Sequence, residues 1–408
     1  MSTQQAPSSR NSATPTLVAL FFGVFVMGCA EMLVVGVLDL IAADLRVSVS
    51  AAGALVTSFA LGIAIGGPVL TVLTMKMNKR TVLIGVLFLF AVANLVLVLG
   101  SGYGLFLAAR FFAGAVEGLF IGVAFVTGIS MVPPERAGRA ISMIISGVTV
   151  SAAVGVPLGT LASQELGWRG SFTTVIVLCV VALIATVALV PSVPVPSGPG
   201  AGRGAAGQAK YAFAPRVLAM LSLNVVVFAS LYTALTYIVP FLRDVTGVTG
   251  AVVSVFLVAY GVATAVGSFG GGRFADRNAA RALLVATTGT AVALLALYVV
   301  GSMPVLVALV LLAWGMLAMS MAPSLQLRVV TLAGPGAGLA SSLPASATNV
   351  GIAVGSAAGG VAISDFGPSA PVITAAIIGV VGIVLAWATS YLKPPVVENT
   401  TEPAAQPS

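Results

Sequence analysis

Long apolar segments recur along the whole chain and are separated by short polar loops. The first runs from Thr16 to Leu38. The others are centred near Gly62, Leu89, Leu119, Gly147, Val181, Ala229, Ala263, Ala291, Ala313, Ala347 and Val380. An apolar run of about 18 or more residues predicts a helix that spans a membrane. Only 7% of the residues are charged, against about 25% in soluble domains, so we expect lipid to be the main solvent of this chain.

The segments predict an all-α integral membrane protein with twelve transmembrane helices in two six-helix, pseudo-symmetric bundles. We expect the first bundle at residues 16–190 and the second at residues 216–392. A cytoplasmic linker rich in proline and glycine, 191–215, joins them in this interpretation. The polar stretches at 1–15 and 393–408 are expected to be disordered cytoplasmic tails.

The two halves carry a related pattern. One constant shift in numbering places Gly66 on Gly267, Lys76 on Arg277 and Arg80 on Arg281. Both loops fall between the second and third predicted span of their half. Two six-helix units about a central linker are the layout of a transporter that alternates access to a site near the membrane midplane.

Basic residues are distributed unevenly between alternate loops, and this bias predicts orientation. With the amino end inside, most Lys and Arg fall in cytoplasmic loops, whereas Arg46, Arg169 and Arg243 fall outside. The net charge of +7 is then a topology signal and does not indicate nucleic-acid binding. We expect a multi-pass protein of the cell membrane, in contact with the lipid bilayer, with both termini in the cytoplasm.

Several classes of site are excluded by composition. The chain has no histidine, which rules out HExxH metalloproteases, Ser-His-Asp triads and His-ligated metals. No GxxxxGK[ST] loop is present, so ATP is not expected as the energy source. Cys29 and Cys179 fall in apolar runs and are expected to be buried free thiols. We therefore expect no metal, no cofactor and no enzymatic activity.

Three charged residues, Glu31, Arg110 and Glu117, fall inside predicted spans. Each costs about 2.5 to 3.5 kcal/mol at mid-membrane on insertion scales, which makes it a functional candidate; the alternative is a structural ion pair. Arg110 and Glu117 are seven residues apart and share a helix face. An apolar environment makes a carboxylate hold its proton more tightly, and a guanidinium opposes this. We predict proton coupling at Glu31, Asp39, Arg110 and Glu117, although Asp39 is equally consistent with a solvated helix end.

The loop that follows the eighth predicted span is a candidate gate. It contains Gly272, Asp276, Arg277 and Arg281. Glycine permits close helix approach, Asp276 can cap a helix, and the arginines can pair with acids at the cytoplasmic rim. Such a cluster could latch one conformation. A basic loop with an ordinary helix cap is the equal alternative.

Small and aromatic residues supply the remaining candidates. In the fifth span, Gly147, Gly155, Pro157 and Gly159 favour close packing and a bend. Helix packing alone largely explains them, and a function would enter only as a hinge or a seal. Adaptable methionine and aromatic side chains suit the lining of a substrate cavity. The residues that we expect there, each of which could instead be ordinary packing, are Asn224, Tyr232, Tyr237, Trp314 and Met316.

Together these motifs resemble the major facilitator superfamily, and within it the drug:proton antiporters, especially bacterial arabinose-efflux-like and chloramphenicol-efflux-like transporters. The resemblance spans nearly the whole chain between the tails and rests on residues 28–32, 110–114, 155–159, 167–169 and 272–281. It implies proton-linked roles for Glu31 and Asp39, assistance to proton transfer by Arg110, a seal against leak at Gly155 and Pro157, and a cytoplasmic gate at Asp276 and Arg277.

Two positions depart from the family pattern. Met75 stands where the loop of the first half should carry the equivalent of Asp276, which implies a weaker latch there. Glu117 is not part of the general motif and could select substrates by charge instead of carrying protons.

The resulting expectation is a monomeric, proton-coupled secondary transporter that exports small organic molecules, such as an antibiotic of the chloramphenicol type. The alternatives are a sugar or metabolite exporter or importer of the same fold, a membrane enzyme, and a sensor or scaffold that transports nothing. The last two are disfavoured by the missing catalytic constellation and by the three intramembrane charges, respectively.

Overall fold

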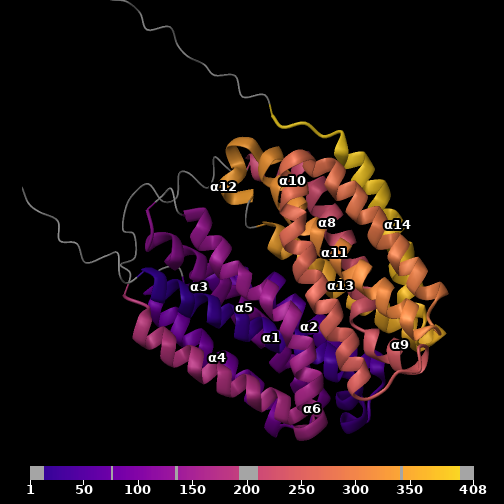
Figure 1. Cartoon of the computed structure of the whole chain (residues 1–408). Helices are drawn as coiled ribbons and strands as arrows, with labels where there is room; N and C mark the ends of the chain where they lie inside the picture. The colour runs from indigo at the N-terminus through magenta and orange to yellow at the C-terminus, as the bar shows by residue number, and fades with distance from the viewer. Residues whose placement is uncertain (1–12, 75–76, 134–136, 193–209, 341–342, 396–408) are drawn as a thin grey trace, which may run out of the picture.

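The computed structural model describes residues 13–74, 77–133, 137–192, 210–340 and 343–395 (Figure 1). All long elements within these ranges are helices. Most of the expected tails and linker lie outside the described residues, as does Met75, whereas residues 13–15, expected in the first tail, already belong to a helix. The all-α fold class predicted from the apolar segments is confirmed.

Six membrane-length segments form the N-terminal half. Its elements are α1 (Ala13–Leu45), α2 (Val49–Leu61), the π-helical η1 (Gly62–Gly66), α3 (Gly67–Thr74), α4 (Lys79–Leu99), α5 (Tyr103–Ser130) and α6 (Ala137–Leu189). The elements α2, η1 and α3 follow one another as a single span. Helix α6 consists of two arms joined at Gly167, whose φ of 66° lies in the left-handed region that favours glycine.

The C-terminal half repeats this plan. Its elements are α8 (Pro215–Leu235), α9 (Ile238–Asp244), α10 (Ala251–Val299), α11 (Pro304–Ala333), η3 (Gly334–Gly336), α12 (Ala337–Ala340), α13 (Leu343–Phe366) and α14 (Ala370–Ser390). Helices α8 and α9 share one span. Helix α10 has two arms that meet at Asn278, whose side-chain Oδ1 caps the second arm by accepting from the Arg281 N–H at 3.0 Å.

Eleven helical segments of the described chain are long and apolar enough to cross a membrane. The first arm of α6, residues 137–166, completes the twelve-helix architecture that the sequence predicts. The protein is therefore a multi-pass membrane protein.

Equivalent glycines show that the halves are built alike. Gly66 lies against Ala115 of α5, and Gly267 lies against Met316 of α11. The numbering shift that relates the two glycines also relates Ala115 to Met316. A second matched pair of contacts joins α6 to α1 at Gly155 and α13 to α8 at Gly355. Small residues at such positions allow two backbones to approach closely.

Helix α1 begins and α14 ends at the same side of the molecule, which we name the terminal end (Figure 1). The opposite side, where α1 ends and α9 lies, is the distal end. The two halves contact each other through α2 with α13 and through α6 with α10. Within the distal half of the molecule, Ser356 Oγ donates to the Gly53 carbonyl and the Tyr237 hydroxyl donates to the Ser356 carbonyl, each at 3.0 Å. We name this contact of Gly53, Tyr237 and Ser356 the seam, because it joins the two halves near the distal end.

Candidate functional site

Arg110 of α5 is fully enclosed, with an exposed fraction of 1%. Its Nη1 donates to the Ala30 carbonyl of α1 at 3.2 Å, and its Nε donates to the Leu55 carbonyl of α2 at 3.5 Å. The guanidinium lies over the Phe59 ring, 3.9 Å from the ring centroid, in a cation–π arrangement. Its Nη2 has no hydrogen-bond partner among the described residues. Arg110 thus connects α5 with α1 and α2, and the two N–H donors of its Nη2 remain available.

Two carboxylates lie within electrostatic range of Arg110. Glu31 is half-buried on α1, and Glu117, two turns along α5, is 2% exposed. Arg110 attracts both, and the two carboxylates repel each other. In the part of the chain that the structure describes, no direct ion pair joins them, and Glu117 Oε2 has no hydrogen-bond partner. The structure therefore brings the three predicted intramembrane charges into one group whose polar atoms are incompletely satisfied.

A cavity between the halves adjoins this charged group. Its lining comes from α1, α8, α10 and α11 and comprises Met32, Tyr232, Leu235, Leu257, Tyr260, Thr264 and Met319. The Tyr232 hydroxyl donates to the sulfur of Met32 at 4.0 Å and lies within electrostatic range of Glu31 and Glu117. The cavity has a volume of about 30 Å³ in this conformation, and its mostly apolar wall carries two thioethers and three hydroxyl groups.

Of the five residues expected to line the cavity, only one is among its lining residues. Tyr232 lines it directly, and Trp314 is fully buried behind Tyr260, with ring centroids 5.0 Å apart. Met316 is 45% exposed on another face of α11 and is not among the lining residues. Met319, three residues further, supplies the thioether instead.

Two other predicted residues connect helices. Asn224 donates to the Pro344 carbonyl and accepts from Thr348, both at 3.1 Å, which joins α8 to α13. Tyr237 belongs to the seam and is 1% exposed. Neither side chain is among those that line the cavity.

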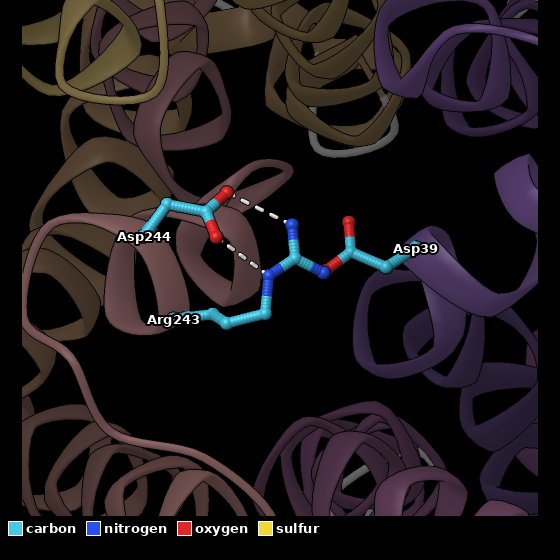
Figure 2. A network of polar contacts seen from close by, with 3 residues as sticks. All are labelled: Asp39, Arg243 and Asp244. Carbon is cyan, nitrogen blue, oxygen red and sulfur yellow. Dashed lines mark hydrogen bonds and ion pairs between the residues drawn. The ribbon is translucent and has the colours of Figure 1, made fainter.

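Asp39 lies at the distal end of α1 and pairs with Arg243 of α9, from the other half of the chain (Figure 2). Arg243 is also held by its neighbour Asp244 through two hydrogen bonds, of 2.7 and 2.8 Å. The distribution of basic residues predicts only that Arg243 lies on the external side, and its ion pair with Asp39 is not visible in the sequence. Asp39 and Glu31 share α1 but interact with different arginines.

The glycines of the predicted antiporter motif face α1. Gly147 lies against the backbone of Phe21 and Phe25, Gly155 against Met32 and Cys29, and Gly159 against Leu33. The side chain of Pro157 lies outside those that the structure describes. The contacts fit close packing of α6 on the helix that carries Glu31 and Asp39.

The predicted gate lies between the two arms of α10 at the terminal end. Arg277 is exposed, and a side chain at Gly272 would meet open space. The side chain of Asp276 lies outside the described ones, and Asn278 caps the following arm through the backbone N–H of Arg281. The structure therefore adds no ion pair to the predicted gate within the residues that it describes.

Two six-helix halves that enclose a cavity beside intramembrane charges are the architecture of many membrane transporters. A family model described as the Major Facilitator Superfamily matches residues 20–343. The chain belongs to this superfamily, which indicates a transporter.

Individual relatives cover nearly the whole chain. The uncharacterised MFS-type transporter YtbD of Bacillus subtilis is 34% identical over 364 residues, covering 88% of this chain and 91% of that protein. The inner membrane transport protein YdhP of Escherichia coli is 30% identical, covering 93% and 96%. The chloramphenicol resistance protein of Streptomyces lividans is 31% identical, covering 83% and 86%.

Solved structures support the fold. A bacterial homologue of the human lysosomal transporter Spinster, in an inward-facing and unoccupied conformation, matches with a TM-score of 0.80 at 16% identity, over 94% of this chain and 98% of that one. The human organic anion transporter MFSD10 matches with a TM-score of 0.62 at 17% identity, over 93% and 100%. At these identities the likeness concerns the fold alone.

Proposed function

We propose that this protein is a proton-coupled exporter of small organic molecules that acts as a monomer in the cell membrane by alternating access. The observation that carries the proposal is the group of half-buried Glu31 with buried Arg110 and Glu117, beside a cavity lined by both halves. Buried charges without direct partners are costly, and in membrane proteins they mark ion and substrate pathways. The relative that is named a chloramphenicol resistance protein supports export and suggests a drug of that type as substrate.

Charge distribution supports an orientation with both termini in the cytoplasm. Lys79, Arg80, Arg216 and Arg328 lie near helix ends at the terminal end, as do the arginines of the loop between the arms of α10. Arg46, Arg169 and Arg243 lie at the distal end. Because positive loops stay in the cytoplasm, the terminal end is cytoplasmic in this proposal. The seam and the Asp39–Arg243 pair then close the external side.

In this proposal, coupling follows from the charges that act on Glu31. When ionised, Glu31 is attracted to Arg110 and repelled by Glu117. A proton on Glu31 removes both forces and changes the attraction between α1 and α5. In the proposed cycle the substrate enters the cavity from the cytoplasm or the inner leaflet. Proton binding at Glu31 from outside then resets the carrier, with Asp39 on the same helix as a relay.

The test is export by wild type and by Glu31→Gln, in inverted membrane vesicles or as resistance in a pump-deficient host. Chloramphenicol, a cationic dye and a pentose are the test substrates, each with and without an uncoupler. Glu165→Gln is the matched control, because Glu165 is an exposed carboxylate on α6, away from the buried charges. Uncoupler-sensitive export that only Glu31→Gln abolishes supports the proposal.

The same experiment separates the alternatives. Export of the pentose alone would favour a sugar exporter of the same fold. Export that survives both the uncoupler and Glu31→Gln would refute proton coupling through Glu31.

A further inference from the structure

Arg243 lies between two carboxylates that come from different halves of the molecule (Figure 2). Its Nη1 contacts Asp39 Oδ2 of α1 at 2.5 Å, and its Nε and Nη2 contact the two carboxylate oxygens of Asp244. The pair with Asp39 crosses from the N-terminal to the C-terminal half. It therefore connects the two bodies that must separate when the distal end opens.

The two aspartates differ in how they contact Arg243. Asp244 grips the guanidinium with both oxygens, which fixes the plane of the fork and leaves Nη1 toward α1. Asp39 is more enclosed than Arg243, with exposed side-chain fractions of 14% and 42%. Asp39 Oδ1 is buried and has no hydrogen-bond partner among the described residues. Asp39 therefore depends on Arg243 for its compensation.

The surroundings of the pair belong to the closed interface. Arg243 follows Tyr237 of the seam by less than two helical turns, and Gly360 of α13 lies against Ser50 at the start of α2. The charged groups that act on Asp39 in the described part of the chain are Arg243, which attracts it, and Asp244, which repels it. An ionised Asp39 thus binds across the interface, and a protonated one loses most of that attraction.

A second ion pair at the distal end provides a comparison within the molecule. Arg169 of α6 contacts Asp44 of α1 at 2.5 Å, with exposed side-chain fractions of 35% and 42%. Both partners belong to the N-terminal half, so this pair stays within one body. Like the pair of Asp39 and Arg243, it joins an aspartate to an arginine, but it does not connect the two halves.

We infer that Arg243 is a coupling residue: it holds ionised Asp39 across the interface of the closed distal end, and proton binding to Asp39 releases the hold. The inference deepens the proposed function, because it rests on proton-coupled transport. Asp244 makes release feasible, since Arg243 keeps two charge-assisted hydrogen bonds after Asp39 has been neutralised and is never left without a partner. Asp39 then provides proton sensitivity at the interface, separate from Glu31 in the interior.

The experiment measures how fast a water-soluble maleimide labels a cysteine at the interface. Ser50→Cys is introduced into a chain whose Cys29 and Cys179 are replaced by alanine, and the protein is labelled in nanodiscs, where both faces are accessible. Each rate is divided by the rate for the same cysteine in the denatured protein at the same pH, because the thiolate is the reactive form and its fraction falls with pH. For the otherwise unchanged protein, this normalised rate is low at high pH and rises as the pH falls. Asp39→Asn and Arg243→Gln each raise the high-pH rate about fivefold, the size expected for a partly exposed ion pair, and abolish the pH dependence.

Arg169→Gln is the matched control and keeps the wild-type rate and pH profile. The inference is overturned if Arg243→Gln labels slowly and with the wild-type pH dependence, or if Arg169→Gln behaves as Arg243→Gln does. Asp39→Asn tests the same contact should Arg243→Gln not fold.

Labelling requires no substrate, so it separates this inference from the proposed function. If export is sensitive to the uncoupler but Arg243→Gln labels as the wild type does, the coupling role of Arg243 is refuted and the proposed function stands. A pH-dependent interface in a protein without proton-coupled export refutes the proposed function and leaves Arg243 as a pH-sensitive contact.

Discussion

Gly53 is the position where the smallest change in sequence should perturb the seam most. Its carbonyl accepts from Ser356 Oγ, and a Cβ added at Gly53 would overlap the hydroxyl and ring of Tyr237. Tyr237 is 1% exposed and donates to the Ser356 carbonyl, so its ring has little room to move. We therefore expect Gly53→Ala to destabilise the state in which the distal end is closed.

The magnitude follows from the overlap. Inserting a methyl group into a well-packed contact costs about 1 to 3 kcal/mol. The cost applies only while α2 of the first half touches Tyr237, the residue before α9 in the second half, and it disappears when the distal end opens. Since about 1.4 kcal/mol is a tenfold change in an equilibrium constant, the population should shift toward the open form by roughly five- to 150-fold. Tyr237→Phe in the Gly53→Ala background removes the nearest overlapping atom and should restore part of the closed population.

The assay is the distance between spin labels on cysteines at Ala43 and Asp365, which are exposed and belong to different halves. Gly53→Ala should broaden the distribution toward longer distances. Gly85→Ala is the control, because a Cβ at Gly85 on α4 would meet no atom within 4 Å. An unchanged distribution in Gly53→Ala would refute the reasoning that the contact of Gly53 with Tyr237 holds the distal end closed.

Two further predictions concern the buried charges and the packing of α1. Glu117→Gln should lower export of a cationic dye about thirtyfold more than export of chloramphenicol, because unit charges about 8 Å apart interact by about 2 kcal/mol at an effective dielectric constant of 20. Equal loss of both in vesicle assays would assign Glu117 to coupling. Gly155→Val should lower the thermal stability of the purified protein, because its side chain would press on Met32 and Cys29 of α1. Gly104→Val, where a Cβ meets no atom within 4 Å, should leave the melting temperature nearly unchanged, and equal losses would argue against the packing explanation.

The fold could be predicted from the sequence because lipid imposes one simple rule. Each span must satisfy its backbone internally, so it appears as a long apolar run, and the runs centred near Leu89 and Val181 fall within α4 and the second arm of α6. The joins between arms are harder, because they depend on single residues. Gly167 breaks α6 through a positive φ, and Asn278 breaks α10 through an extended backbone and a cap. Neither residue stands out from the many other glycines and polar residues near helix ends.

The site could be predicted only in part. Glu31, Arg110 and Glu117 stand out because a charge in an apolar run is rare, and the structure places them together. The sequence of a span that is apolar on all sides does not show which face of the helix lines a cavity. Met316 and Met319 read alike in the sequence, yet one is exposed and the other lines the cavity.

The contacts between the two halves could not be predicted from any local pattern in the sequence. Tyr237 reads as a cavity aromatic, but its hydroxyl meets Ser356, more than a hundred residues away. The contact of Asp39 with Arg243 likewise depends on how two separately folded bundles dock. The nearest sequence signal was Asp244 beside Arg243, since an acid next to an arginine at the end of a span can orient it toward a partner.

Helix α1 carries two acids whose arginine partners belong to different bodies. Glu31 is attracted to Arg110 within its own half, and Asp39 is paired with Arg243 of the other half. The two acids are about 12 Å apart along the axis at 1.5 Å per residue, and α6 packs against the helix between them through Gly155 and Gly159. A helix held this closely moves as a rigid body. In the proposed cycle, a change in the attraction between Glu31 and Arg110 would therefore act on Asp39 as well, and would connect a proton in the interior to the contact that closes the distal end.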